Sequence, residues 1–148
     1  MPSLQFKQFE AGTTPMAIAK SISEGLAKRI LVASINGQVW DMNRPVYEDA
    51  ALKLLAWDDS DGKATFWHSS AHLMAEAVES MFPGVKFWVG PPIDKGFYYD
   101  MDLGGAQITE EDLVKLEKKM VELAKQNNQF VRKEISKADA VAYFTEKG

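Results

Sequence analysis

Residues 30–40 read ILVASINGQVW, and this stretch decides the fold expected for the first half of the chain. An apolar run over residues 30–35 leads into Asn36 and Gly37, the pair that best tolerates the positive φ angles of a tight hairpin turn. Residues 38–40 then carry the chain back alongside the first strand. The sequence therefore predicts an antiparallel β-hairpin at this point.

Elements on both sides of the hairpin follow from simpler signals. Thr14 followed by Pro15 predicts the start of a helix, because threonine caps free amides and proline at the first helical position loses no useful donor. Apolar residues then recur at helical spacing as far as Gly25, where we expect the helix to end. Alternation over residues 4–9 predicts a short strand before it, and residues 52–57 predict another after the hairpin.

The polar run over residues 58–62 breaks the apolar pattern and predicts a domain boundary. We therefore expect two α+β domains, residues 1–62 and residues 63–148. The second should begin with a helix over residues 65–82. One stripe of this helix has clear helical spacing and should face the core, namely Trp67, Ala71, Met74, Val78 and Met81.

Further elements are expected along the second domain. Residues 85–89 and 97–99 predict two strands joined by a shaped loop, and Thr109 with Asp112 predicts a capping box at the start of a helix. Residues 130–135 predict a final strand. A last helix should follow Ser136, with three apolar residues facing inward, Ala138, Val141 and Phe144.

Composition limits the class of protein. The chain of 148 residues is 46% hydrophobic and 26% charged, which is typical of a globular protein. It has neither an apolar run long enough for a bilayer nor a signal-peptide pattern, so we expect a soluble cytoplasmic protein with no membrane association. The absence of cysteine excludes disulfides and thiolate metal sites.

The balance of charge bears on nucleic-acid binding. A net charge of -4 argues against a surface that is basic throughout, although a local cluster can still bind phosphates. Two such groups are candidates, and the alternative for each is an ordinary solvated helix or strand face: Lys115, Lys118 and Lys119, and the pair Arg132 and Lys133. The tryptophans at positions 40, 57 and 88 are expected to pack in the core or against the sheet instead of stacking on bases.

The two histidines of the chain, His68 and His72, are the main candidates for chemistry. Their four-residue spacing places both imidazoles on one face of the predicted helix, where they could share a substrate, a water molecule or a metal. A zinc ion would need a third ligand, for which only Glu76 is near, and Ser69 stands where a helical zinc protease has glutamate. The alternative is two exposed residues with ordinary hydrogen bonds.

The second candidate region covers residues 90–100, GPPIDKGFYYD. Glycines at its two bends permit close approach of a ligand, and prolines stiffen the loop between them. Asp94 could accept hydrogen bonds from an amine or hydroxyl, and Tyr98 and Tyr99 should point to opposite faces, one into a cleft and one into packing. The alternative is a hairpin with a packed aromatic pair.

HSSAHL at residues 68–73, followed by GPPIDKGFYYD, resembles the editing domain of threonyl-tRNA synthetases, and the second motif is highly specific. The preceding part, with GLAK at residues 25–28 and the Asn36-Gly37 turn, resembles the ubiquitin-like β-grasp module called the TGS domain. The resemblance covers nearly the whole chain. It implies an α+β protein, with a TGS domain over 1–62 and the first part of an editing domain over 63–148.

The resemblance also implies a function. Such an enzyme joins threonine to tRNA(Thr) with ATP, and its editing site hydrolyses tRNA(Thr) mischarged with serine. His68 and His72 match the family's editing histidines, which position the tRNA 3′ end and the attacking water. Gly90, Asp94 and Tyr99 match the loop and strand that border the same pocket. No metal or cofactor is implied for this chain, whereas ATP, Mg²⁺ and Zn²⁺ belong to the synthetic domain, and the full-length enzyme is expected to be a homodimer.

Three departures from the family pattern limit what this chain is expected to do alone. The family's remaining editing residues, a lysine and a Cys-and-His segment, would lie beyond Gly148, so the isolated chain should lack editing activity. The synthetic domain is absent, and the first strand of the TGS domain is missing, which would expose a sheet edge. The alternatives are a stand-alone hydrolase of mischarged tRNA and a non-enzymatic RNA- or protein-binding module.

Overall fold

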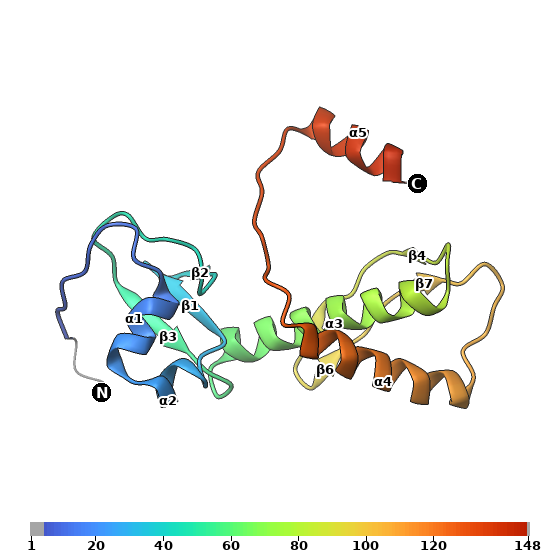
Figure 1. Ribbon diagram of the computed structural model, residues 1–148, viewed down its shortest axis with the longest axis horizontal. Coiled ribbons are helices and arrows are strands. Elements are labelled where there is room, and N and C mark those ends of the chain that lie inside the picture. Colours follow the sequence, from blue (N-terminus) through green and yellow to red (C-terminus); the bar gives the residue numbers. More distant parts are fainter. Residues whose placement is uncertain (1–4, 148) are drawn as a thin grey trace.

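The computed structural model of the protein describes residues 5–147, which form a mixed α+β structure (Figure 1). A small unit contains α1 (Pro15–Ile22), α2 (Glu24–Ala27), β1 (Val32–Ile35), β2 (Gln38–Trp40) and β3 (Leu52–Leu55). The long helix α3 (Ser60–Met81) leads away from it. The remaining elements are β4 (Lys86–Phe87), β5 (Pro92–Ile93), β6 (Gly96–Phe97), β7 (Met101–Asp102), α4 (Glu110–Gln126) and α5 (Lys137–Lys147).

The sheet of the first unit is antiparallel, with strand order β2-β1-β3. The hairpin expected from the sequence is confirmed: Ile35 pairs with Gln38, and the turn between them has φ angles of 51° at Asn36 and 85° at Gly37. The central strand β1 is buried along its whole length. It therefore supplies the core on which the two short helices pack.

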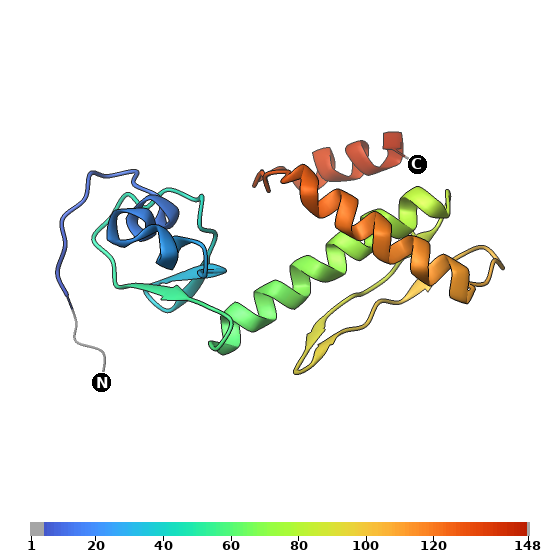
Figure 2. The same ribbon diagram turned by 60° about the horizontal axis from the view of Figure 1, so that its bottom comes forward.

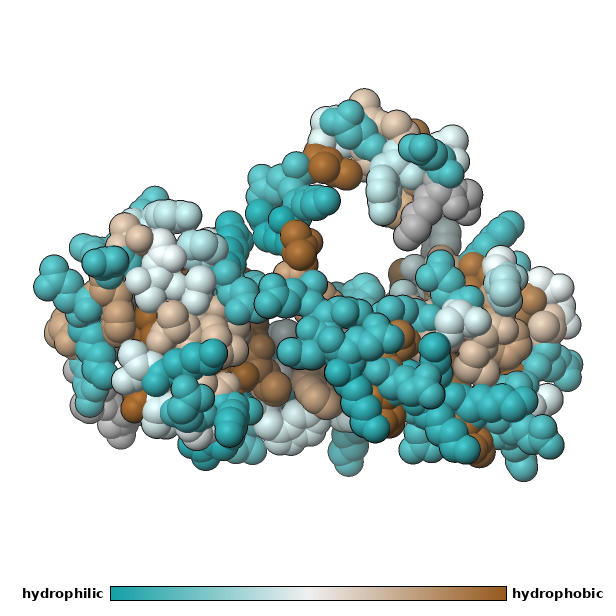
Figure 3. All heavy atoms as spheres, viewed as in Figure 1, coloured by the Kyte–Doolittle hydropathy of each residue, from teal (hydrophilic) through white to brown (hydrophobic). Residues whose placement is uncertain are grey.

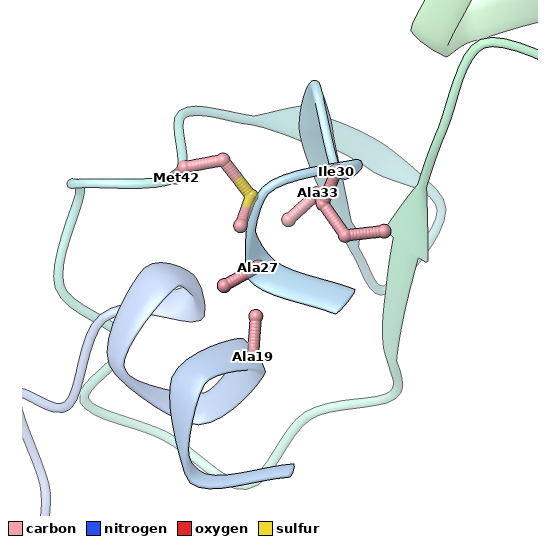
Figure 4. Packing of buried hydrophobic residues seen from close by; sticks show 5 residues of the cluster. All are labelled: Ala19, Ala27, Ile30, Ala33 and Met42. Atoms are coloured by element: carbon pink, nitrogen blue, oxygen red, sulfur yellow. The ribbon is translucent and has the colours of Figure 1, made fainter. Parts of the chain in front are cut away.

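The core of the first unit is a cluster of small residues and one methionine (Figure 4). Its buried members are Ala19, Ala27, Ile30, Ala33 and Met42. Alanines let the helices approach the sheet closely, and Met42 fills the remaining gap from the loop after β2. The helix start is confirmed as well, since the Thr14 side chain accepts a hydrogen bond from the amide of Ala17.

The helical segment breaks two residues before the expected end. Ser23 ends α1 and its hydroxyl accepts from the amide of Leu26, so that it also caps α2, and Gly25 lies inside the second short helix. The strand expected over residues 4–9 is wrong for residues 5–9, which form no regular structure, while Leu4 lies outside the described residues. Phe6 is 99% exposed there, because no neighbouring strand covers it.

Helix α3 begins at Ser60, five residues earlier than expected, because the last three residues of the polar run, 60–62, belong to its first turn. The predicted core stripe is confirmed at its centre, where Ala71 and Val78 are completely buried. Helix α4 packs along α3, and its capping box is present, with Thr109 and Asp112 each accepting from the backbone amide of the other (Figure 2). In the described part of the chain, no helix is long and apolar enough to cross a membrane.

Two two-stranded ribbons lie beside α3. Strands β4 and β7 pair in one ribbon, and β5 and β6 form a hairpin. The expected strand over residues 85–89 is regular only at residues 86–87, although Trp88 and Asp100 continue the pairing through a hydrogen bond of 2.9 Å. Trp88 is 82% exposed, so the expectation that it packs in the core or sheet is wrong.

The C-terminal segment departs most from expectation. Residues 130–135 contain no strand, because no strand lies beside them to pair with, and Phe130 and Val131 are more than 70% exposed. The helix after Ser136 is present as α5, but it stands apart from the other elements (Figure 1). The prediction that Ala138, Val141 and Phe144 point inward is therefore wrong, because all three are exposed. Hydrophobic residues interrupt the polar surface along this C-terminal segment (Figure 3).

Candidate functional site

The two histidines lie one helical turn apart on an exposed face of α3, and their rings stack. The ring centroids of His68 and His72 are 4.8 Å apart and the planes are inclined by 26°. Both side chains are exposed, and within residues 5–147 neither imidazole has a hydrogen-bonding partner. The prediction that the four-residue spacing places both imidazoles on one face of the helix is therefore confirmed. Both rings are accessible to a ligand from solution.

The surroundings of His72 favour its neutral form. Desolvation lowers the pKa of His72 below its ordinary value, and repulsion from the charge on His68 lowers it further. A neutral imidazole has one nitrogen that donates a hydrogen bond and one that accepts. His72 can therefore accept a proton or hydrogen bond from a water molecule near neutral pH.

A group of aromatic rings lies directly before the histidines. The ring of Trp67 contacts Trp57 and Phe66 edge-on, at centroid distances of 5.6 Å and 5.5 Å. On the side of the β5–β6 hairpin it meets Phe97 at 6.3 Å. The indole nitrogen Nε1 of Trp67 is buried without a hydrogen-bonding partner. This aromatic cluster holds the hairpin against α3 close to His68.

Gly90 and Tyr99 are brought into direct contact. A Cβ atom at Gly90 would lie 2.5 Å from the Tyr99 ring, and that ring packs edge-on against Phe87, with the ring centroids 5.3 Å apart. Tyr99 is half-buried, whereas Tyr98 is 51% exposed. Of the two tyrosines, Tyr99 is the one that packs, but both lie beyond the end of β6 at Phe97, so the strand expected over residues 97–99 is regular only at Phe97. The expected opposite orientation of the two rings, with one in a cleft, stays a prediction.

Asp94 stands apart from the other candidates, at the exposed turn of the β5–β6 hairpin. In the described residues, no hydrogen bond or ring contact joins either histidine to Gly90, Asp94 or Tyr99. The structure thus forms two separate groups, the histidine pair and the Gly90–Tyr99 contact. The assignment of all five residues to one pocket stays a prediction.

The metal alternative receives no support from the geometry. Among residues 5–147, no three His, Asp or Glu side chains stand close enough together to share a metal ion. His68, His72 and Glu76 therefore do not form a zinc site in this structure.

Two residues at the start of α3 were missed by the sequence interpretation. Asp59 and Gly62 hold the beginning of the helix against the end of β3. The available signal was a glycine within a helical pattern, which is unfavourable unless another part of the backbone approaches closely. The sequence instead suggested a domain boundary at that segment.

Comparison with known proteins identifies the class first. Residues 2–56 match the family model of the TGS domain, and the α+β arrangement of α1, α2 and β1–β3 agrees with its ubiquitin-like β-grasp fold. The first part of the chain is thus a TGS domain.

Curated relatives match nearly the whole chain. The chain is 54% identical over 147 residues to the threonine–tRNA ligase of Cytophaga hutchinsonii, 50% to that of Parabacteroides distasonis and 52% to that of Porphyromonas gingivalis. Each alignment covers 99% of this chain but only 22% or 23% of the relative. The chain is therefore homologous to threonine–tRNA ligases over nearly its whole length, and it spans less than a quarter of theirs.

Proposed function

We propose that this chain is the TGS domain and the first part of the editing domain of an enzyme that ligates threonine to tRNA(Thr) with ATP. In this proposal, residues 63–148 contribute to hydrolysis of tRNA(Thr) mischarged with serine, and the region contacts the tRNA. The observation that carries it is the exposed, stacked pair His68 and His72, in a chain whose relatives are named threonine–tRNA ligases.

A hydrolytic second site is physically sensible for this substrate. Serine lacks only the methyl group of threonine, and one methyl in a binding pocket discriminates by about 1–3 kcal/mol. A synthetic site therefore accepts some serine. Removing the product afterwards raises the accuracy beyond what binding alone provides.

The reaction needs a positioned water and a proton path. The water oxygen attacks the carbonyl carbon of the seryl ester, the bond from that carbon to the ribose oxygen breaks, and the ribose oxygen takes up a proton. We assign to His72 the acceptor role, because its lowered pKa keeps it neutral, and to His68 the positioning of the tRNA 3′ end. Gly90, Asp94 and Tyr99 would border the pocket.

We place ATP, Mg²⁺ and Zn²⁺ in the part of the longer protein that this chain does not include. The described residues offer no cluster of three metal-ligating side chains, and no Gly-rich phosphate loop occurs in the sequence. The partner is tRNA(Thr), the full-length enzyme acts as a cytoplasmic homodimer, and the 148-residue chain alone lacks a complete editing pocket.

Deacylation of Ser-tRNA(Thr) tests the proposal. We expect no hydrolysis by the 148-residue chain, hydrolysis by the full-length enzyme, and loss of that hydrolysis in His68→Ala or His72→Ala full-length variants. Glu79→Ala, an exposed position further along α3, is the matched control and should keep the activity. Rapid hydrolysis by the short chain would contradict the incomplete pocket, and editing that survives both histidine substitutions would contradict the catalytic assignment.

A further inference from the structure

The end of β3 and the start of α3 are joined by a short turn that is fixed by hydrogen bonds. The Asp59 carboxylate oxygen Oδ2 accepts from the amide of Ala56 at 2.8 Å, and the amide of Asp59 donates to the Ala56 carbonyl at 3.2 Å. Asp59 is the N-cap of α3, yet its side chain accepts from none of the helix amides. Because an N-cap carboxylate ordinarily bonds to its own helix, this one instead holds the strand end.

Gly62 fixes the same turn from inside the helix. It is buried, and a Cβ atom there would lie 2.0 Å from the Ala56 carbonyl oxygen and 2.9 Å from the carbonyl carbon. Both atoms are backbone, so they cannot move aside as a flexible side chain would. Glycine is unfavourable in a helix relative to alanine, and the close approach of the strand end accounts for its presence.

Aromatic packing closes the other side of the junction. Trp57, between the strand and the helix, meets Phe66 at 5.1 Å and Trp67 at 5.6 Å, both edge-on. The Lys63 ammonium lies 5.6 Å from the centre of the Trp57 ring. Helix α3 also contacts the central strand β1. The first turn of α3 is therefore held by backbone contacts and by packing at once.

We infer that Asp59 and Gly62 are positioning residues, which set the direction of α3, and with it His68 and His72, relative to the sheet of the TGS domain. The two histidines lie on the same uninterrupted helix as Gly62. The TGS domain and the histidine-bearing helix thus move as one body. This inference goes beyond the proposed function, because it holds whether or not the histidines hydrolyse an ester.

A distance measurement between two spin labels tests this inference. The sequence contains no cysteine, so cysteines introduced at Lys20 on α1 and Glu79 on α3, both exposed, can be labelled selectively. Pulsed electron–electron double resonance on the 148-residue chain should give a single narrow distribution of distances between the two labels. Asp59→Ala and Gly62→Ala should each broaden or shift it, whereas Asp59→Asn, which keeps an acceptor oxygen for the Ala56 amide, should restore the original distribution.

Two substitutions serve as matched controls. Asp58→Ala removes a neighbouring exposed carboxylate that makes no hydrogen bond within the described residues, and Gly25→Ala adds a Cβ atom whose nearest neighbour is Ser23 Oγ at 3.9 Å. Both should leave the distribution unchanged.

Circular dichroism and thermal unfolding separate positioning from simple stabilisation. A residue that only stabilises the fold would lower the melting temperature without changing the distance in the folded chain. If Gly62→Ala does not fold, the distance distributions of Asp59→Ala and Asp59→Asn are sufficient to test the positioning role. An unchanged distribution in folded Asp59→Ala would overturn the inference.

Discussion

Gly90 and Tyr99 are in such close contact that the Cβ atom of any other residue at position 90 would lie 2.5 Å from the tyrosine ring. The ring of Phe87 packs edge-on against that of Tyr99, at a centroid distance of 5.3 Å. A movement of the Tyr99 ring would therefore also disturb its contact with Phe87 in β4. The glycine in this motif is required by packing, whatever ligand the neighbouring loop binds.

Gly90→Ala should destabilise the chain by about 1–3 kcal/mol, the usual cost of forcing an added carbon into a packed site. Urea unfolding measures the change. The added Tyr99→Ala substitution should recover part of the loss, because it removes the clashing ring, and a double-mutant cycle gives the coupling between the two positions. Equal unfolding curves for Gly90→Ala and the parent would show that the contact is absent.

His68→Ala should raise the pKa of His72 part of the way to its ordinary value. It removes the repulsion from His68 but leaves the larger effect, desolvation, in place. NMR titration of the imidazole protons measures this, with Glu79→Ala as the control that should leave the His72 pKa unchanged. A His72 titration that does not respond to His68→Ala would show that the stacked arrangement does not persist in solution.

The same lowered pKa makes stability depend on pH. Between the folded pKa and the ordinary value of about 6.5, the unfolded chain binds more protons at His72 than the folded chain does. The free energy of unfolding should therefore fall as the pH is lowered through this window. In His72→Gln the contribution of His72 to this decrease in the free energy of unfolding should disappear. Unfolding curves at pH 7 and below will measure it.

Thr109→Ala should raise the pKa of Asp112. The hydrogen bond from the Thr109 hydroxyl, 2.7 Å long, is the largest cause of the lowered pKa of this carboxyl, followed by the bond from the Thr109 amide. Thr109→Ser keeps the hydroxyl and should leave the pKa low. NMR titration of the carboxyl carbon distinguishes the two variants. The pKa of Asp112 is lower in the folded state than in the unfolded state, so the ionised carboxylate stabilises the fold. This stabilisation is lost as the pH falls through the folded-state pKa of Asp112.

Asn36→Ala should destabilise the TGS domain by about 1–2 kcal/mol, because it removes the acceptor for a backbone amide and places alanine at a positive φ angle. The Asn36 side-chain oxygen accepts from the amide of Ala51 at 2.8 Å, and φ at Asn36 is 51°. Asn36→Asp retains an acceptor and should cost less. Thermal unfolding gives the ranking, and equal costs for the two variants would contradict the role of the hydrogen bond.

Local signals in the sequence predicted local structure well. Asn36 with Gly37 predicted the hairpin, and Thr109 with Asp112 predicted the start of a helix. In each case the residues that carry the signal themselves form the turn or the helix cap. The strands expected over residues 4–9, of which residues 5–9 are described, and over residues 130–135 are absent for the opposite reason. Alternation shows only that one face of a segment could be buried, and a strand also needs a neighbouring strand, which no local pattern supplies.

The candidate site shows the same division. The stacking of His68 on His72 follows from helical spacing alone and was predictable. The contact of Gly90 with Tyr99 joins the two segments that flank the β5–β6 hairpin, so it depends on strand pairing that the sequence does not display. Asp59 was interpreted only as part of the polar run at a domain boundary, because its partner is a backbone amide, and any residue type could have supplied that amide.

Because α3 is long and uninterrupted, a small change in its tilt at the N-terminal end displaces its C-terminal end by a large distance. At a rise of 1.5 Å per residue its 22 residues extend for about 33 Å. A tilt of about 5° at Ser60 would therefore move Met81 by about 3 Å, which is the length of a hydrogen bond. A substitution in the TGS domain that repacks Ala56 by a fraction of an ångström can thus displace α4, which rests on the far part of this helix, by far more than the original change.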